Sequence, residues 1–461
     1  MTENKKTLFI GEDGKNLVFT FILVSSLFLL WGVCNGMIDV MDKHFQEELS
    51  LTKSQSAWVQ FAHYLGYFLM SVPAGWLATK LGYKGGIITG LLIVAAGGLW
   101  FIPATQINAL VHEGRVSPNL AFVGFLAGVC AIATGLTFLE TIANPYTTVL
   151  GARQYAATRI NLAQSCNGVG WIFGPIIGSM YFYSKDALGH STGSQTLYIP
   201  YAAIAVVVIV LAVVFYFADI PDIKTGDDYH LDDAAPGSSR SIWSHPHFVM
   251  AVAAQFFYVA AQAGIFSFFI NYMTSEVPPI PGSWQTGLAS VSSHSSFLQG
   301  WLSGWFETNA AGVLGMSNKG ASNLASLGFV CFLAGRFSGA GLLRKFAAYK
   351  ILAIYSVVNV GATVLVFCKL GWLSVACVFL SYFFMSIMFP TIFALGIFGL
   401  GARAKKASAF IVMAIMGGAI LPKLMGYVAD KYDMSRGFIV PAACFVVVAF
   451  YGFNWPRFSK A

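Results

Sequence analysis

The chain has 461 residues, of which 57% are hydrophobic and only 10% are charged. Soluble domains carry about 25% charged residues, so this composition excludes an ordinary soluble enzyme or binding domain. The net charge of +7 gives no sign of nucleic-acid binding, because the Lys and Arg residues stand in short polar stretches between apolar runs.

Twelve apolar runs follow one another along the chain, and runs of this kind are long enough to cross about 30 Å of hydrocarbon as helices. The first run is longer than a signal-peptide core and lacks a cleavage site, so we interpret it as a retained span. The sequence therefore predicts an all-α polytopic membrane protein with twelve transmembrane helices. They are expected at 17–40, 55–79, 85–104, 118–146, 157–183, 198–218, 246–272, 321–343, 350–369, 371–399, 407–429 and 437–455.

The distribution of Lys and Arg predicts the orientation, because cytoplasmic loops carry an excess of both. With both termini in the cytoplasm, seventeen of the 27 basic residues fall on the cytoplasmic side and eight on the outer side. We therefore expect cytoplasmic termini. The predicted divisions are a tail at 1–16, a six-helix bundle at 17–218, an acidic cytoplasmic linker at 219–245, a second six-helix bundle at 246–455 and a tail at 456–461.

The two predicted bundles resemble each other in sequence. "GWLATKLGYK" (75–84) and "GLLRKFAAYK" (341–350) share Gly, Leu and a closing Tyr-Lys, and "NPYTTVLG" (144–151) is similar to "FPTIFALG" (389–396). Two parallel six-span repeats with the substrate between them are the architecture of major-facilitator transporters. We expect a gating or structural role for Gly75 and Lys84 in the first of these loops.

Two acidic residues, Asp39 and Glu140, fall inside predicted spans. A carboxylate at the centre of a membrane costs about 2.5–3.5 kcal/mol on insertion scales, and such acids usually mark an ion or proton pathway. For Glu140 the alternative is a permanent ion pair with Arg336 of the eighth span. Asp39 lies near the outer end of the first span, where an interfacial position is the alternative. In the second repeat Met385 stands at the place of Glu140, so the acid belongs to one half only.

Polar residues line one face of four predicted spans at helical spacing, where i, i+3 and i+4 share a face. Such stripes can simply join neighbouring helices, but four of them favour a polar central cavity. Amides and carboxylates suit a neutral polyhydroxylated ligand, whose hydroxyls both donate and accept, and an aromatic face would cover the apolar side of a sugar. The stripes are Trp31, Asn35 and Asp39; Thr137, Glu140 and Asn144; Asn161, Gln164 and Asn167; and Gln255, Tyr258 and Gln262.

Three further polar residues of the spans have competing interpretations. His63 titrates near neutrality in its unperturbed form and is a candidate proton relay, although a packing role is the commoner one. Arg336 either anchors a polar network or closes the floor of the cavity. Lys423 lies near the outer end of its span, where its side chain is expected to reach the interface.

Two segments raise separate hypotheses. "GVGWIFGPIIG" (168–178) loosely resembles the Gly-Pro motif of proton-coupled antiporters, but close helix packing with a kink is the interpretation we prefer. The outer insertion 276–320 contains one apolar face that predicts a short amphipathic helix at the interface, with a lid over the cavity as the alternative. That face comprises Phe297, Leu298, Trp301, Leu302, Trp305 and Phe306.

Several stretches together resemble the L-fucose:proton symporter family. They include "FLLWGVCNGMIDVMDKHF", "FLETIANPYTTVLG", "INLAQSCNGVG", "AQFFYVAAQ", "FMSIMFPTIFALG" and "SAFIVMAIMGGAILPKLMGYVAD". The resemblance covers nearly all twelve spans and implies the major-facilitator fold and alternating access without ATP. It also implies that Asp39 and Glu140 are the protonatable, substrate-linked pair and that Gln164 and Asn167 help to line the sugar cavity; Asn35 matches as well.

The chain departs from the family pattern at several places. Gly36 and Ile38 stand where the fucose symporter has Asn, His63 replaces an aromatic residue, and the insertion 276–320 is longer than expected. Thr79 stands where most major-facilitator proteins have Asp, which this family also tends to lack. Part of the polar wall of the first span is therefore missing. The identity of the sugar stays open.

These observations predict a proton-coupled sugar symporter of the bacterial inner membrane, monomeric, with L-fucose or a related hexose as substrate. Glu140 would be protonated from outside, bind the sugar together with its proton and release both inside, since a low dielectric favours the neutral carboxyl. Other coupling is the alternative: sodium symport, uniport or efflux antiport.

A membrane enzyme or a sensor is less favoured. The seven cysteines match neither a disulfide framework nor zinc spacing, and no His-rich or HExxH-like cluster is present. We therefore predict no metal, no cofactor and no enzymatic activity. The longest polar stretch is also too short for the output domain of a sensor.

Overall fold

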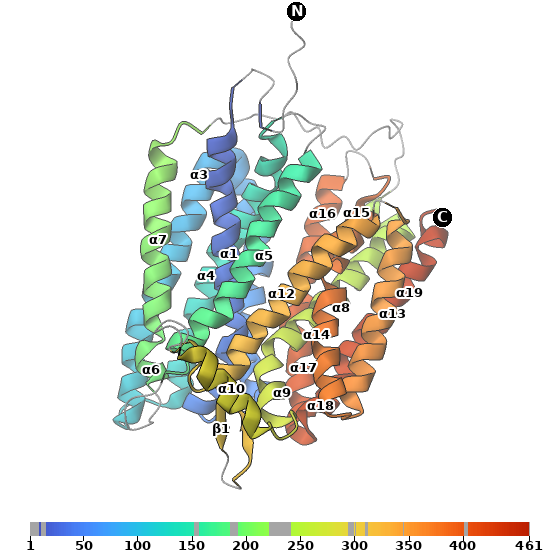
Figure 1. Ribbon diagram of the computed structural model, residues 1–461. Coiled ribbons are helices and arrows are strands. Elements are labelled where there is room, and N and C mark those ends of the chain that lie inside the picture. Colours follow the sequence, from blue (N-terminus) through green and yellow to red (C-terminus); the bar gives the residue numbers. More distant parts are fainter. Residues whose placement is uncertain are drawn as a thin grey trace, which may run out of the picture. The chain divides into compact units, whose positions relative to one another are not determined.

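The computed structural model describes residues 9–10, 15–151, 156–184, 192–220, 241–293, 299, 301–308, 312–343, 345–400 and 404–460. This part of the chain is mostly helical, and ten of its segments are helices long and apolar enough to cross a membrane. The predicted spans 55–79 and 157–183 are also helical, although they are not among those ten. The all-α polytopic fold is thus confirmed (Figure 1).

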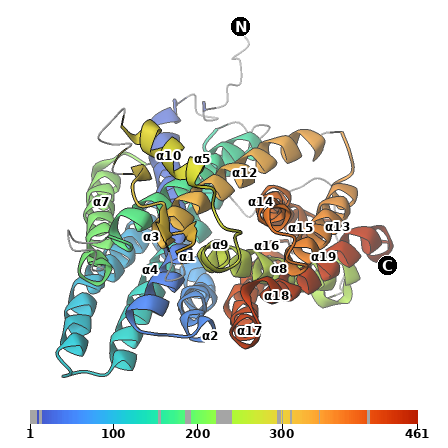
Figure 2. The same ribbon diagram turned by 60° about the horizontal axis from the view of Figure 1, so that its bottom comes forward.

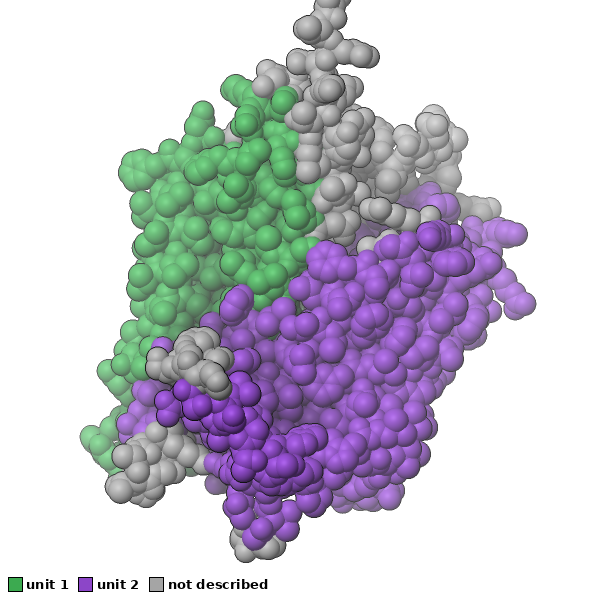
Figure 3. Space-filling view, viewed as in Figure 1, with its two compact units in different colours: residues 1–36, 62–171, 198–233 green, residues 37–61, 172–197, 234–461 purple. Residues whose placement is uncertain are grey.

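The helices group into two compact units, which Figure 3 colours separately. Unit 1 comprises residues 1–36, 62–171 and 198–233, and unit 2 comprises 37–61, 172–197 and 234–461. These units do not follow the predicted bundles, because 37–61 and 172–197 group with the later part of the chain. The division at the linker 219–245 stays a prediction, and most of that linker lies outside the described residues.

Unit 1 is a group of long helices in contact through glycines. A Cβ atom on Gly97 of α3 would come 2.7 Å from the backbone nitrogen of Ile132 in α4, so the two helices touch there. The ring of Phe101 in α3 stacks on that of Tyr201 in α7 at 3.9 Å. The helices that contribute to this unit are α1 (Val18–Glu48), α3 (Trp58–His112), α4 (Pro118–Val149), α5 (Ala156–Tyr181) and α7 (Tyr198–Phe217).

Helix α3 contains both the second and the third predicted spans. The predicted boundary at 80–84 is marked by Gly82, whose φ of 68° and ψ of −179° are not helical. Only glycine adopts this conformation without strain, since a Cβ atom would clash with the backbone. The boundary therefore exists as a kink rather than as a loop.

Unit 2 contains the end of α1 and most helices after residue 241. Figures 1 and 2 both show α13 beside α19, and the rings of Tyr349 and Trp455 stack between them at 5.6 Å. The elements are α2 (Lys53–Ser56), α6 (Gly193–Thr196), η2 (Ile242–Ser244), α8 (Pro246–Ser267), α9 (Phe269–Ser275), α10 (Gly282–Ser292), β1 (Phe306–Thr308), β2 (Leu314–Met316), α12 (Asn318–Leu343), α13 (Ala348–Phe367), α14 (Trp372–Met385), α15 (Met388–Ile397), α16 (Ala404–Met413), η4 (Ala414–Met416), α17 (Gly417–Lys431), α18 (Met434–Gly437) and α19 (Ile439–Phe458).

Three predicted spans of unit 2 are interrupted helices. The span 246–272 divides into α8 and α9 at Phe268, and 371–399 divides into α14 and α15 at Ser386 and Ile387. The span 407–429 divides into α16 and α17, with η4 between them. The apolar runs did not indicate these interruptions, although 372–397 and 410–431 each remain one helical segment long and apolar enough to cross a membrane. At Phe268 the helical hydrogen bonds continue, because its N–H donates to the carbonyl of Gly264 and its carbonyl accepts from the N–H of Tyr272.

The outer insertion differs from its prediction. It contains α10 and an antiparallel hairpin in which Phe306 pairs with Met316 and Thr308 with Leu314. Phe306 therefore lies in a strand, and the predicted amphipathic helix cannot extend through it. Phe297 and Leu298 of that predicted face lie outside the described residues.

Candidate functional site

The polar residues predicted to act in function lie in both units, and each group is described within its own unit. In unit 1, Trp31 of α1 donates its indole N–H to the Tyr67 hydroxyl of α3 at 2.5 Å. The same hydroxyl lies near the amide of Asn35 and the carboxyl of Glu140. Tyr67 thus brings together residues of the first and the second predicted stripes, although it was not among the candidates predicted from the sequence.

A chain of amides continues this group. Gln164 of α5 donates its Nε2 to Oδ1 of Asn144 in α4 at 3.0 Å, and Asn167 donates its Nδ2 to Oε1 of Gln164 at 3.2 Å. Asn144 follows Glu140 by one helical turn, so the amide chain and the carboxyl share one face of α4. We call Trp31, Asn35, Tyr67, Glu140, Asn144, Gln164 and Asn167 the unit 1 cluster.

Glu140 forms no hydrogen bond and no ion pair with any described residue of unit 1. It is partly exposed, whereas Asn35 and Asn167 are buried and each has a side-chain oxygen without a hydrogen-bond partner in the described part of the chain. A buried oxygen without a donor is costly. The cluster therefore contains two buried acceptors and a carboxyl without a hydrogen-bond partner among the described residues.

Two of the remaining stripe residues do not add to this cluster. The Thr137 hydroxyl donates to the carbonyl of Ala133 in its own helix at 2.7 Å, so it satisfies its backbone rather than a ligand. The side chain of Asn161 lies outside the described part. The unit 1 cluster is thus smaller than the predicted stripes.

His63 lies next to this cluster. Its ring is 5.0 Å from the rings of both Tyr64 and Tyr67, and the side chain is buried. Its Nδ1 atom has no hydrogen-bond partner among the described residues. The aromatic surroundings agree with a packing role, and proton relay stays a prediction.

Close helix packing brings α1 and α5 together beside the cluster. A Cβ atom on Gly170 would collide with the carbonyl of Leu29, and one on Gly32 would collide with the carbonyl of Asn167. Small residues at such crossings let two backbones approach each other. The packing interpretation of the 168–178 motif is therefore confirmed for Gly170.

In unit 2, Asp39 is buried and accepts a hydrogen bond from Gln60 of α3 at 2.9 Å. Helix α1 continues to Glu48, so Asp39 lies well inside it rather than at its end. The same extension places Asp42 inside the helix with none of its surface exposed. The prediction that only two acids lie within spans was therefore wrong, because the buried helix runs past the charged residues that seemed to end it.

Two residues predicted to act in function donate hydrogen bonds at the interruption between α14 and α15. Tyr258 of α8 donates its hydroxyl to the carbonyl of Met385 at 2.9 Å, and the Nε of Arg336 in α12 lies 3.5 Å from the carbonyl of Ser386. Pro390 has no N–H to give to the Ser386 carbonyl four residues earlier. Arg336 thus supplies the donor that the proline lacks, and its guanidinium also packs on the Phe332 ring at 5.1 Å.

The other two residues of that stripe lie on the same helix. Gln255 is completely buried, and neither atom of its amide group has a hydrogen-bond partner in the described part of the chain. Gln262 is partly buried. Gln255 therefore has a donor and an acceptor without a partner among the described residues, whereas the Tyr258 hydroxyl donates to the Met385 carbonyl.

Three residues assigned to gating or to the interface have definite positions. Lys84 of α3 donates its Nζ to the carbonyl of Ala218 at 2.9 Å, where a cation at the end of α7 stabilises the free carbonyls. Gly75 lies within α3, two turns before the kink. Lys423 places its Nζ 3.6 Å from the ring centre of Trp58, a cation–π contact, and its extension to the interface stays a prediction.

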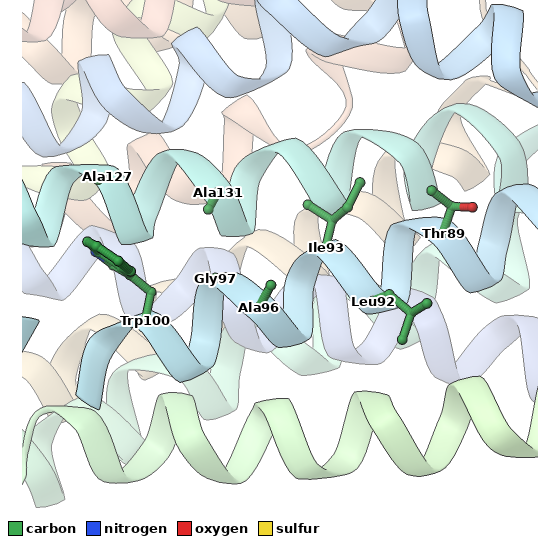
Figure 4. A pocket seen from close by; sticks show the side chains of 8 residues that line it. All are labelled: Thr89, Leu92, Ile93, Ala96, Gly97, Trp100, Ala127 and Ala131. Atoms are coloured by element: carbon green, nitrogen blue, oxygen red, sulfur yellow. The ribbon is translucent and has the colours of Figure 1, made fainter. Parts of the chain in front are cut away.

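A hollow of about 570 Å³ lies between α3 and α4 in unit 1 (Figure 4). Thr89 is its only hydroxyl-bearing residue, and the rest of the lining is apolar or, in Trp100, aromatic. The indole N–H of Trp100 donates a hydrogen bond to the carbonyl of Gly124 at 2.8 Å. This hollow does not suit a polyhydroxylated ligand, so the unit 1 cluster is the better candidate.

Comparisons with known proteins agree with this fold. The sequence pattern of the Major Facilitator Superfamily matches residues 19–396. The chain is 33% identical to the L-fucose-proton symporter of Escherichia coli K12, over 95% of this chain and 93% of that protein. It is 30% identical to a glucose/galactose transporter of Brucella abortus, over 95% and 94% of the two chains.

Solved structures give the same result. A crystal structure of a variant of the E. coli fucose:proton symporter FucP matches with a TM-score of 0.64 and 32% sequence identity. The match covers 96% of this chain and 99% of the other. The resemblance noted from sequence motifs is thus confirmed over almost the whole chain, and the chain is a multi-pass membrane protein.

Proposed function

This chain belongs to the major facilitator superfamily, and we propose that it is a proton-coupled symporter of L-fucose or a related hexose that works by alternating access. Two kinds of relative support this proposal. One is named an L-fucose-proton symporter and the other a glucose/galactose transporter, and both align with nearly the whole chain. Their two names span several hexoses, so the particular sugar is a matter for experiment.

The sugar site is proposed to use the unit 1 cluster. Its amides carry both donors and acceptors, which match hydroxyl groups of a sugar, and the Trp31 ring supplies an apolar face. The hydrogen bond from Trp31 to Tyr67 fixes the orientation of that ring. Gln255 and Gln262 in unit 2 are proposed as additional sugar contacts, together with Tyr258, whose ring is held by its bond to Met385.

The proton is proposed to bind Glu140, with Asp39 as the second protonatable group. The observation that carries this proposal is the Glu140 carboxyl, which has no ion-pair partner among the described residues and lies near enough to the Tyr67 hydroxyl to interact with it electrostatically. A carboxylate without a cation is costly in a membrane protein, and binding a proton removes that cost. The proton and the sugar then enter and leave together.

The membrane placement follows from the same function. We propose the bacterial inner membrane, cytoplasmic termini and a monomeric protein that acts without a cofactor. The excess of Lys and Arg on the predicted cytoplasmic side supports the orientation. The relatives are named as transporters, which supports transport rather than enzymatic catalysis.

Uptake by proteoliposomes tests this function. The purified protein is reconstituted, and the accumulation of a panel of labelled hexoses is measured with an imposed proton gradient, an imposed sodium gradient or no gradient. We expect accumulation of at least one hexose with the proton gradient alone. Accumulation driven only by sodium, or equilibration without accumulation under either gradient, would establish one of the other coupling modes.

A further inference from the structure

Helix α1 carries a second buried acid one turn beyond Asp39. Asp42 has no exposed surface, and Asp39 is only 5% exposed. Neither oxygen of Asp42 has a hydrogen-bond partner within the described residues, and Oδ2 of Asp39 has none either. Residues three positions apart share a helix face, so the two carboxyls are neighbours.

Neutral groups from other helices of unit 2 surround this pair. Gln60 of α3 donates to Oδ1 of Asp39 at 2.9 Å. The Ser267 hydroxyl at the end of α8 is completely buried and lies close enough to Asp42 to interact with it, although the two groups do not meet ordinary hydrogen-bond geometry. Neither group has another hydrogen-bond partner among the described residues.

The titratable groups around the pair do not neutralise it. Asp39 lies near Tyr382 of α14, and Asp42 lies near Tyr183, which follows α5. Both are phenols, which are neutral at physiological pH. Among the described residues, the charged group that lies close enough to influence Asp42 is Asp39, the other acid of the pair.

The basic neighbours on α1 itself have other partners. Lys43 forms an ion pair with Glu47, with 3.2 Å between Nζ and Oε1. The buried ring of His44 lies 5.9 Å from the ring of Phe182 and 6.2 Å from that of Tyr183. Two ionised carboxylates would thus lie side by side in a low dielectric without a counter-ion, which is strongly unfavourable.

We propose that Asp39 and Asp42 form a carboxyl dyad that binds one proton and constitutes a second proton site, separate from Glu140. The proton comes from water onto one carboxyl oxygen and returns to water when it leaves, so the dyad alternates between one negative charge and two. Acids that share a site in this way titrate as a pair rather than singly. The dyad rests on the proposed proton-coupled function and adds Asp42 to it.

Infrared spectroscopy of the purified protein tests the dyad directly, because the C=O stretching band of protonated carboxyls reports the bound proton. The measurement starts from Glu140→Gln, which removes the first proton site. We expect this variant to keep a protonated-carboxyl band at neutral pH. The absence of such a band would overturn the dyad whether or not any further variant folds.

Further substitutions in the Glu140→Gln background show which carboxyl groups give rise to the band. Adding both Asp39→Asn and Asp42→Asn should remove it. Adding Asp42→Asn alone should move the midpoint pH of the band downward by about 1 unit or more, since a negative neighbour no longer holds the proton on Asp39. The matched control is Glu47→Gln on the same helix, whose half-exposed carboxyl already has a lysine partner. A band or midpoint that Asp42→Asn leaves unchanged contradicts the dyad.

Two further outcomes distinguish failure of the dyad from failure of the proposed transport function. If the bands behave as expected but proteoliposomes show no proton-driven sugar uptake, the dyad stands and the proposed function fails. If uptake is proton-driven but the bands do not respond to the two aspartates, the dyad alone fails. Loss of the band on exchanging choline chloride for sodium chloride would show that the pair binds sodium, and that result overturns the proton dyad.

Discussion

Asn271 in α9 donates its Nδ2 to Oε1 of Gln46 in α1, with 2.5 Å between the two atoms, although 225 positions separate them in the chain. Both side chains are buried within unit 2, and Gln46 also donates its Nε2 to the Ser56 hydroxyl at 2.8 Å. The contact joins the end of the first helix to a helix from the second predicted repeat. It shows why unit 2 includes residues 37–61.

This amide pair should be energetically coupled. We expect Gln46→Ala and Asn271→Ala each to lower thermal stability, and the double variant to lose less than the sum, by about 0.5–1.5 kcal/mol for a buried hydrogen bond. Thermal unfolding in detergent of the two single variants and the double variant gives the coupling energy. Strict additivity would mean that the two amides do not interact.

Replacing Glu140 should uncouple transport without abolishing sugar binding. Glutamine resembles the protonated acid in shape but cannot exchange a proton, so Glu140→Gln should lower pH-driven accumulation at least about tenfold, which corresponds to about 1.4 kcal/mol of driving force. Exchange of labelled for unlabelled sugar should persist. Glu113→Gln is the matched control, because Glu113 is exposed and its neighbour is Arg115. Normal accumulation by Glu140→Gln would remove that residue from the proton pathway.

The aromatic contact at Trp31 should contribute to sugar affinity. Aromatic contacts are worth about 0.5–1.5 kcal/mol, so Trp31→Ala should weaken sugar binding by about 2- to 13-fold. Tyr67→Phe keeps the tyrosine ring but removes the hydroxyl that accepts the indole hydrogen bond, and it should have a smaller effect. Trp100→Ala changes a tryptophan of the apolar hollow in the same unit and should leave affinity unchanged. Equal losses in Trp31→Ala and Trp100→Ala would indicate a general loss of structure instead.

An ionic cluster outside the spans makes a pH-dependent contribution to stability. Lys369 lies 3.0 Å from Oδ2 of Asp433 and 3.3 Å from Oε2 of Glu276. The hydrogen bond to Asp433 raises the pKa of Lys369. Burial acts to raise the pKa of Asp433, but the Arg436 N–H and Lys369 outweigh it and the pKa is lowered.

The direction of each pKa shift defines the pH range over which the ionic cluster stabilises the protein. The contribution of Asp433 is present above its unfolded pKa of about 3.9 and is lost as pH falls through the lower folded value. That of Lys369 is present below about pH 10.4 and is lost as pH rises through the higher folded value. Lys369→Met should therefore destabilise the protein between these limits, by less than about 1 kcal/mol because Lys369 is 46% exposed.

Thermal unfolding of Lys369→Met and the parent protein across this range checks the window. The difference between them should shrink toward both extremes of pH. The control is Lys345→Met at an exposed position between α12 and α13, which should show no such profile. A difference that stays constant with pH would exclude an ionic origin.

The apolar runs were enough to predict the helices, because lipid-spanning segments need long uncharged stretches. They could not predict where helices are interrupted. Phe268 divides α8 from α9 with no proline beside it, so packing decides that point. Pro390 is visible in the sequence, but the Arg336 and Tyr258 donors that make the nearby break tolerable come from distant helices.

The candidate site was predictable only in part for a similar reason. Helical spacing found Trp31, Asn35 and Glu140, but Tyr67 joins them from another helix, and no pattern on its own helix indicates this. Gln60 likewise could not be identified from its own helix, because its role depends on the hydrogen bond that it donates to Asp39. Asp42 fell outside the predicted first span, 17–40, whereas the helix continues to Glu48 with that acid completely buried.

The most direct test of proton-coupled sugar symport is the external pH of de-energised cells that express the protein. Addition of a transported hexose should alkalinise the medium transiently, because each sugar that enters takes a proton with it. Cells that express Glu140→Gln should show no such change. Sugar uptake by the parent protein without any movement of protons would contradict symport.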